Sequence, residues 1–243
     1  GKLFVDQYFS ENAKNKVNLM VDNIMDAFKV RLNELDWMSD ETKELAKYKL
    51  ASFGRKLGFP EKWRDYDGLD ITSDQYCQNI KNISLFATKK NHEKLGKEKD
   101  PTEWSMPPHM VNAYYHPLYN EIVFPAGIMQ PPFFDEFASD AVNYGRMGMV
   151  IGHEFTHGFD DQGAQFAADG SLTNWWSEKD LEKFKERTDK LGATFSQFCP
   201  FDDACVQPNM TMGENIADLG GITLAYYAYK KTDEYKKGEK VNG

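Results

Sequence analysis

Amphipathic helices dominate the pattern of apolar and polar positions along this chain. Over residues 12–35, apolar side chains such as Val17, Val21 and Ile24 recur at three- and four-residue spacing, which places them on one face of a helix. Similar spacing, together with capping residues and glycine or proline stops, predicts further helices at residues 39–52, 75–96, 137–159, 177–198 and 213–231. We therefore expect a predominantly helical protein.

Two short runs of β-branched and aromatic residues interrupt this pattern, at residues 111–115 and 121–124. A polar turn that contains Pro117 and Asn120 separates the two runs, which is typical of adjacent strands. The predicted fold class is therefore α+β, predominantly α-helical, with one small β-sheet.

The region after the second predicted helix lacks a regular period. Gly54, Gly58 and Pro60 are expected to end that helix. Residues 61–74 combine aspartates, a glycine and a tryptophan without helical or strand spacing. We interpret them as an irregular connection and a candidate boundary.

Length and charge exclude some classes of protein. The chain has 243 residues and a formal net charge of -9, so nucleic acid is not an expected partner, because its phosphates would be repelled. No apolar run is long enough to span a bilayer, and the first residues do not resemble a signal peptide. Both ends of the sequence look cut, and we expect a fragment of a longer protein.

The three cysteines leave two interpretations open. Cys199 and Cys205 flank a short loop that a local disulfide could close, in which case Cys77 would be unpaired. Alternatively, all three are buried or incidental thiols, because a buried cysteine behaves as a small apolar residue.

The most informative motif lies at residues 153–157, which read His-Glu-Phe-Thr-His. On a helix, positions i and i+4 share a face, so His153 and His157 can hold a single zinc ion while Glu154 faces its open coordination position. A chance match on a surface helix is the alternative. The apolar residues before the motif argue against it, because they would bury this helix and a buried histidine pair needs a partner such as a metal.

Glu214 is the candidate for a third zinc ligand. A carboxylate from a second helix completes a site of two histidines and one glutamate, and leaves the fourth position for water. Asp218 lies one helical turn further on the same face, where its carboxylate can accept the free ring N–H of a ligand histidine. On its own such an acidic pair is usual on a solvated helix face. Its conjunction with the zinc motif favours a metal site.

Glu154 is the predicted general base, which takes the proton of a zinc-activated water as that water attacks a peptide carbonyl. Asp160 and Asp161 follow the motif and are either extra metal ligands or partners in structural hydrogen bonds and ion pairs. Zinc peptidases also use a histidine, tyrosine or arginine to stabilise the oxyanion. This chain has no histidine after His157 and no arginine after Arg187.

Segments that resemble those of a known protein family extend well beyond the zinc motif. They lie at residues 112–115, 123–128, 130–134, 150–154, 157–161, 174–176 and 213–218. In order and spacing they resemble the neprilysin and endothelin-converting-enzyme family of zinc metallopeptidases, and bacterial oligopeptidases of this type in particular. The resemblance covers essentially the whole chain and implies a thermolysin-like zinc peptidase lobe.

The resemblance also implies roles for individual residues. It implies one Zn²⁺ per chain held by His153, His157 and Glu214, with Glu154 as the base and Asp218 supporting His153. It further implies two groups of substrate contacts. The first pairs with the backbone of an extended peptide, as an edge strand would, and the second lines the pocket for the residue after the scissile bond. The first group is Asn112 and Ala113, and the second is Ile128, Phe133, Met149 and Val150. Plain core packing is the alternative for the second group.

Members of this family are much longer than this chain. The resemblance implies an N-terminal helical lobe that admits only short peptides, and a C-terminal segment with a histidine and an arginine for the transition state. We expect both to be missing here. Residues 1–65 are then a helical region that precedes the zinc lobe, and residues 66–243 are the catalytic lobe, truncated at its C-terminus. The isolated chain is expected to bind zinc and to be weak or inactive as a peptidase.

The leading prediction is a zinc metalloendopeptidase that cleaves short peptides on the amino side of large apolar residues. Because members of the family act outside the cytoplasm, we expect a periplasmic, cell-surface or secreted location. A zinc aminopeptidase is a second enzyme class, but the chain lacks the Gly-x-Met-Glu-Asn motif of exopeptidases. A zinc-binding module that binds peptides without turnover is the alternative from a different class.

Overall fold

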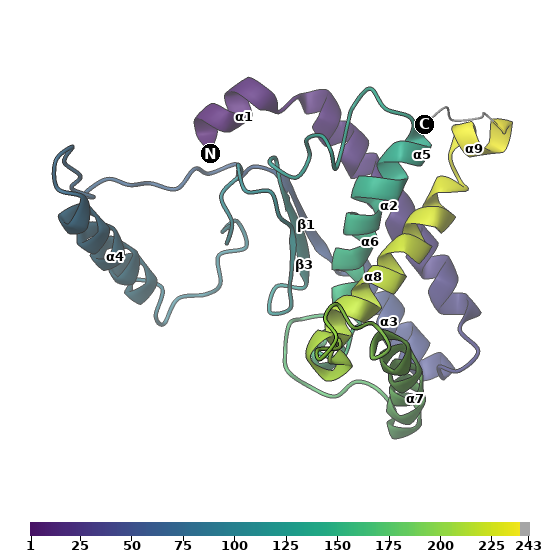
Figure 1. Ribbon diagram of the computed structural model, residues 1–243. Helices are drawn as coiled ribbons and strands as arrows, with labels where there is room; N and C mark the ends of the chain where they lie inside the picture. The colour runs from purple at the N-terminus through teal and green to yellow at the C-terminus, as the bar shows by residue number, and fades with distance from the viewer. Residues whose placement is uncertain (239–243) are drawn as a thin grey trace. The chain divides into compact units, whose positions relative to one another are not determined.

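The computed structural model of the chain describes residues 1–238, which are mostly helical with one small sheet (Figure 1). The predicted fold class is confirmed. Packing divides the chain into two compact units: one joins Gly1–Phe59 to the chain from Met106 onward, and the other is Pro60–Ser105. The division into residues 1–65 and 66–243 concerns the lobes of a longer enzyme and stays a prediction.

Long helices form most of the larger unit, and three of them begin at a serine. The hydroxyls of Ser10, Ser39 and Ser177 each accept a hydrogen bond from a backbone N–H in the first turn, which satisfies a donor that the helix leaves open. The helices that follow these serines are α2 (Glu11–Glu34), α3 (Asp40–Ala51) and α7 (Glu178–Phe195). All three were predicted from the sequence within three residues at each end.

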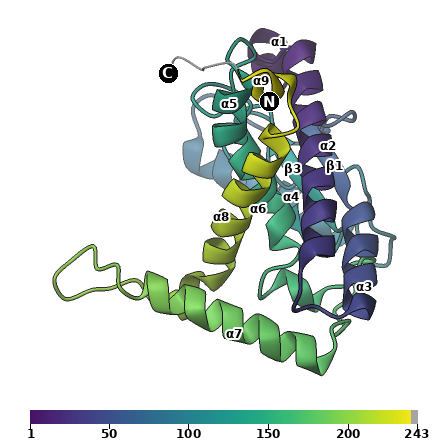
Figure 2. The same cartoon turned by 90° about the vertical axis from the view of Figure 1, so that its right-hand side faces the viewer.

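The zinc motif lies in a helical run that changes its winding. Residues 137–159 were predicted as one helix, and the structure has α5 (Asp140–Asn143), a π-helical turn η1 (Tyr144–Gly148) and α6 (Met149–His157). Helix α8 (Pro208–Tyr229) starts earlier than predicted, at a proline whose missing N–H costs nothing in the first turn. Helices α2, α6 and α8 run side by side, and α7 lies crosswise at one end of them (Figure 2).

The core lies between these helices and the sheet. Val17, Val21 and Ile24 on α2 have no exposed surface, as their spacing predicted. They belong to one apolar cluster that includes Phe124 from the sheet and Ile151 from α6. The helix that carries the zinc motif is therefore buried on one side.

The sheet has three strands in the order β1-β3-β2: β1 (Gly54–Gly58), β2 (Tyr114–His116) and β3 (Glu121–Pro125). The central strand β3 is buried throughout. It pairs with β1 in parallel orientation and with β2 in antiparallel orientation. The adjacent pair β2 and β3 was predicted, although β2 begins three residues later than expected. Strand β1 was not predicted, because its two glycines were interpreted only as helix stops.

Short elements complete the larger unit. They are α1 (Lys2–Tyr8), the 3-10 turn η2 (Gly163–Gln165) and α9 (Asp233–Lys237), and none of them was predicted. No helix within residues 1–238 has the length and apolar character needed to cross a bilayer.

The smaller unit, Pro60–Ser105, contains helix α4 (Tyr76–His92) and the irregular segments around it. The side-chain amides of Asn79 and Asn82 donate to the backbone carbonyls of Thr72 and Asp70, which ties the preceding loop to the helix. The irregular connection and the helix after it were both predicted.

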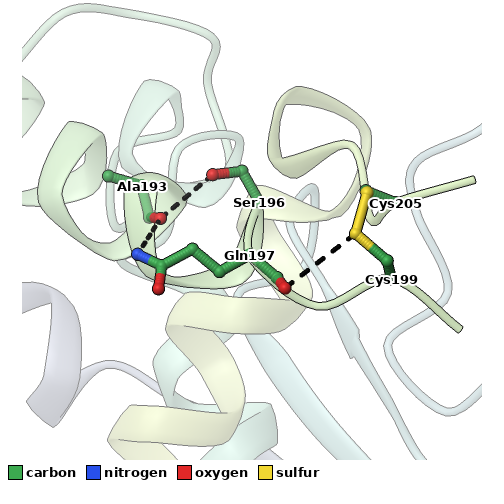
Figure 3. Close-up of a disulfide and its surroundings, with 5 residues drawn as sticks. All are labelled: Ala193, Ser196, Gln197, Cys199 and Cys205. Carbon is green, nitrogen blue, oxygen red and sulfur yellow. Dashed lines mark hydrogen bonds between the residues drawn. A yellow bond between two sulfur atoms is a disulfide. The ribbon is translucent and has the colours of Figure 1, made fainter.

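A disulfide closes the loop between α7 and α8. The structure joins Cys199 to Cys205, the first of the two interpretations, and Cys77 is an exposed free thiol. At the end of α7, the carbonyl of Ala193 accepts hydrogen bonds from Ser196 and Gln197 just before the bridged loop (Figure 3).

Candidate metal centre

Helices α6 and α8 supply the candidate ligands, and glycines let them cross closely. A Cβ added at Gly221 would lie 2.6 Å from the carbonyl oxygen of Met149, and one added at Gly152 would lie 2.8 Å from that of Gly221. No side chain fits at either distance, so glycine is needed at both positions. The crossing places His153 and His157 of α6 opposite the first half of α8.

The three predicted ligands converge on one point. The Nε2 atoms of His153 and His157 lie 2.9 Å apart, and Glu214 Oε2 lies 3.2 Å from the first and 3.7 Å from the second. Zinc bonds of about 2.0–2.1 Å in a tetrahedron place neighbouring ligand atoms roughly 3.3 Å apart. The ligand atoms therefore lie close to the corners that a single zinc ion requires.

A carboxylate holds each histidine ring from its far side. His153 Nδ1 lies 2.9 Å from Asp218 Oδ1, and His157 Nδ1 lies 2.7 Å from Asp160 Oδ2. An ionised carboxylate only accepts hydrogen bonds, so each Nδ1 carries the proton and donates it. Both Nε2 lone pairs then point toward each other and toward Glu214. Lone pairs this close repel unless a cation lies between them, so the donor set fits a divalent metal.

Burial dominates the electrostatics of Glu154, which is only 6% exposed. Loss of hydration raises the pKa of its carboxyl group to about 7. The charge of Glu214 also raises it, whereas His157 and a hydrogen bond from the Tyr115 backbone lower it. For His157 itself, burial lowers the pKa, but the hydrogen bond to Asp160 and the surrounding carboxylates raise it above its ordinary value. Little water reaches the carboxylates of Glu154 and Asp160, which strengthens their interactions with the neighbouring charges.

The predicted backbone-binding residues border the same cavity as the ligands. This cavity has a volume of about 430 Å³, and its lining includes Asn112, Ala113, Glu154 and all three candidate ligands. Asn112 and Ala113 come just before β2, at an edge of the sheet, and the Asn112 side chain accepts the Ala113 N–H at 2.9 Å. The structure brings this pair beside the metal centre, and their role in substrate binding stays a prediction.

The four predicted pocket residues are not among those that line this cavity. Ile128 is 5% exposed and belongs to the core, and Phe133 and Val150 pack against that core. Met149 is half-buried. Within the part of the chain that the structure describes, none of the four lines the cavity at the ligands. Their role in binding an apolar side chain stays a prediction, and plain core packing stays the alternative, which the burial of Ile128 fits.

The contacts of two residues near the candidate ligands were not predicted from the sequence. Asp160 was left open between metal ligand and structural partner, and its carboxylate supports His157 instead. Its position three residues after His157 was the available signal. Lys49, whose ammonium group lies against the turn after α6, was missed altogether. Its place at a buried helical position, three residues after Ala46, was the only trace in the sequence.

Sequence profiles relate this chain to known proteins. The profile described as peptidase family M13 matches residues 112–243, and a second profile with the same description matches residues 1–60. The endothelin-converting enzyme homolog of Locusta migratoria is 40% identical over 241 residues, which cover 96% of this chain and 33% of that protein. The chain spans about a third of the length of the curated relatives it matches.

Solved structures agree with these matches. The inhibitor complex of the Mycobacterium tuberculosis zinc metalloprotease ZMP1 superposes with a TM-score of 0.90 at 44% identity, covering 94% of this chain and 35% of that one. PepO from Lactobacillus rhamnosis superposes with a TM-score of 0.86 at 35% identity, covering 92% of this chain and 36% of that one.

Proposed function

This chain belongs to peptidase family M13, and we propose that it is the zinc-binding part of a metalloendopeptidase that hydrolyses short peptides. Membership confirms the resemblance to neprilysin and endothelin-converting enzymes. The observation that carries the proposal is the convergence of His153, His157 and Glu214, whose ligand atoms lie within 4.8 Å of one another, in a cavity that Glu154 also lines.

In this proposal, His153, His157 and Glu214 hold one Zn²⁺ ion. Bound zinc supplies a Lewis acid that activates water and polarises a peptide carbonyl. Asp218 and Asp160 hold the two imidazole rings in the tautomer that leaves Nε2 free to bind metal.

Glu154 is the proposed general base. Glu154 directly follows the first ligand along α6 and lines the same cavity as the three ligands, which supports this role. It takes the proton of a water molecule as that water attacks the peptide carbonyl. It then returns the proton to the amine that leaves.

We propose that an extended peptide lies along the sheet edge at β2, where the backbones of Asn112 and Ala113 pair with it. A large apolar side chain after the scissile bond is the proposed preference, with Ile128, Phe133, Met149 and Val150 as its contacts. This preference is supported by the family resemblance, as is the proposed location outside the cytoplasm.

For the isolated 243-residue chain, binding of zinc and peptide with weak or no turnover is a second candidate function. It is favoured by the absence of any histidine after His157 and any arginine after Arg187 in this sequence. Zinc peptidases use such groups to stabilise the oxyanion.

Substituting Glu154→Gln separates the two functions. We expect the wild-type chain to bind one zinc ion by metal analysis. The Glu154→Gln variant should keep that zinc and lose any peptide cleavage that the wild type shows, whereas a pure binding module should be indifferent to the change. Glu182→Gln, at an exposed position of α7, is the matched control and should alter neither property. Zinc that binds equally well after His153→Ala and His157→Ala would refute the metal centre.

A further inference from the structure

Lys49 is a buried cation that comes from far away in the sequence and lies beside the metal centre. It is 1% exposed, near the end of α3. Its ammonium group donates to the carbonyl oxygens of Gly158 at 2.6 Å, Gly163 at 2.8 Å and Phe166 at 2.6 Å. All three acceptors belong to residues 158–166, the turn that directly follows the zinc motif.

Burying an ammonium group is costly unless its three N–H donors are all used. Three carbonyl oxygens meet this requirement, and aromatic rings enclose the charge. The ammonium nitrogen lies 5.4 Å from the ring centre of Phe159, 5.7 Å from that of Trp175 and 5.9 Å from that of Tyr115. A fully bonded cation in such a cage holds its acceptors in one arrangement.

The arrangement of this turn determines where Asp160 points. The Oδ1 atom of Asp160 accepts the backbone N–H groups of Gln162 at 2.9 Å and Gly163 at 2.6 Å, which leaves Oδ2 for His157 Nδ1. The turn also folds back tightly onto α6, because a Cβ added at Gly163 would lie 1.7 Å from the carbonyl oxygen of His157. Two of the carbonyls that Lys49 holds, at Gly158 and Gly163, lie on either side of Asp160 along the chain.

We propose that Lys49 is a positioning residue for the metal centre, which holds the turn at residues 158–166 so that Asp160 orients His157 for zinc. The inference rests on the proposed zinc site and deepens it. Lys49 touches no ligand atom, and it acts through the turn and Asp160. An α3 residue thereby contributes to a site built on α6 and α8.

The test compares two lysines that each donate to backbone carbonyls. Lys49→Met keeps much of the side-chain volume and removes the three donors. Lys183→Met is the matched control. The Lys183 ammonium, on α7, donates to the backbone carbonyl of Trp37, just before α3, at 2.6 Å. Zinc affinity is measured for both by competition with a chelator, at a temperature where near-ultraviolet circular dichroism shows each variant folded.

We expect Lys49→Met to weaken zinc binding about 10-fold or more, the range seen when groups behind a metal ligand are removed. The visible spectrum of the chain loaded with Co²⁺ in place of zinc should also change, because the His157 ring is released. Lys183→Met should lose stability and keep its zinc affinity within about twofold, since its contact is remote from the centre. Unchanged zinc affinity and an unchanged Co²⁺ spectrum in folded Lys49→Met would overturn the proposal.

Two further variants keep the test decisive. Lys49→Gln retains two N–H donors and should fall between wild type and Lys49→Met, and it carries the same criterion if the methionine variant does not fold. In the double variant with Asp160→Asn, the losses of zinc affinity should be clearly less than additive, because both residues act on His157. Additive losses would contradict a route through Asp160. A wild-type chain that binds no zinc would refute the metal centre itself. If instead the wild type binds zinc and the Lys49 variants bind it equally well, only the proposal for Lys49 fails.

Discussion

The two histidine–carboxylate pairs of the metal centre have the same chemistry and opposite surroundings. His153 Nδ1 lies 2.9 Å from Asp218 and His157 Nδ1 lies 2.7 Å from Asp160, but the Asp218 side chain is 57% exposed and that of Asp160 only 5%. Water competes for Asp218 and weakens its interaction, whereas Asp160 is shielded. The two histidine side chains are similarly exposed, at 17% and 20%, so the difference lies in their partners: one carboxylate is at the protein surface and the other is inside the fold.

The difference follows from the elements that carry the two carboxylates. Asp218 lies within α8, one helical turn after Glu214, so the regular backbone of that helix places it. Asp160 lies in the turn after α6, where backbone N–H groups and the cage around Lys49 fix it. A supporting carboxylate on a regular helix can therefore remain solvated, whereas one in a turn needs a buried framework to hold it.

The largest expected effect comes from disrupting the close crossing of α6 and α8, the helices that carry the three candidate ligands. In Gly221→Ala, the new Cβ would meet the carbonyl oxygen of Met149 at 2.6 Å and the backbone nitrogen of His153 at 2.9 Å. Because backbone atoms cannot move aside cheaply, we expect a loss of about 2–3 kcal/mol in the free energy of unfolding, together with weaker zinc binding. Urea denaturation and metal competition measure the two effects.

Gly145→Ala is the matched control for the substitution at this helix crossing. A Cβ at Gly145 would meet nothing within 4 Å, so the variant should be as stable as the wild type or slightly more stable. Equal stability of the two alanine variants would contradict the close crossing of α6 and α8.

Removal of the two carboxylates should cause unequal losses of zinc affinity. Asp160→Asn should weaken zinc binding by about 10- to 100-fold, and Asp218→Asn by less than about 10-fold, because removal of a supporting group matters more where water cannot replace it. Chelator competition at matched ionic strength measures both. An Asp218→Asn loss equal to or larger than that of Asp160→Asn would show that burial does not set the strength of these pairs.

The smallest expected effect concerns a buried carboxylate far from the metal. Asp180 joins the starts of α3 and α7 and is 1% exposed. Burial raises its pKa, but hydrogen bonds from Ser39, Thr42 and Ser177 outweigh burial and lower the pKa to about 2 from an ordinary 3.8. A lowered pKa means that the carboxylate stabilises the fold above about pH 4 and loses that contribution as the pH falls toward 2.

Asp180→Asn should therefore cost on the order of 1–2 kcal/mol at pH 7, and the difference from wild type should shrink between pH 4 and pH 2. Denaturation at several pH values measures this difference. Asp189→Asn removes an exposed ion pair with Lys185 and should change stability by less than about 0.5 kcal/mol at any pH. A deficit of Asp180→Asn that grows in acid would refute the assigned pKa direction.

The convergence of the candidate ligands could be predicted from the sequence because their spacing is mostly local. The spacing of His153 and His157 and that of Glu214 and Asp218 are properties of single helices, and the structure brings the two pairs together. The helix at residues 12–35 was equally accessible, since its apolar face repeats within a few turns.

The missed features depend on contacts between distant segments. Strand β1 has little strand character of its own, and its backbone pairing with β3 spans more than sixty residues of sequence. The role of Lys49 depends on a turn that lies more than one hundred residues later. No local pattern of apolar and polar positions encodes either contact. The contact between Asp160 and His157, by contrast, could have been predicted from the conformation of the turn that joins them.

The glycine contact between α6 and α8 couples the metal centre to the cooperative unfolding of the core. Functional residues often lie on loops that open with little free energy, and their amide protons then exchange quickly with solvent. Here the backbone of His153 packs directly against Gly221 between two core helices. We therefore expect the amide protons of the ligand-bearing backbone to exchange with solvent about as slowly as those of the core helices.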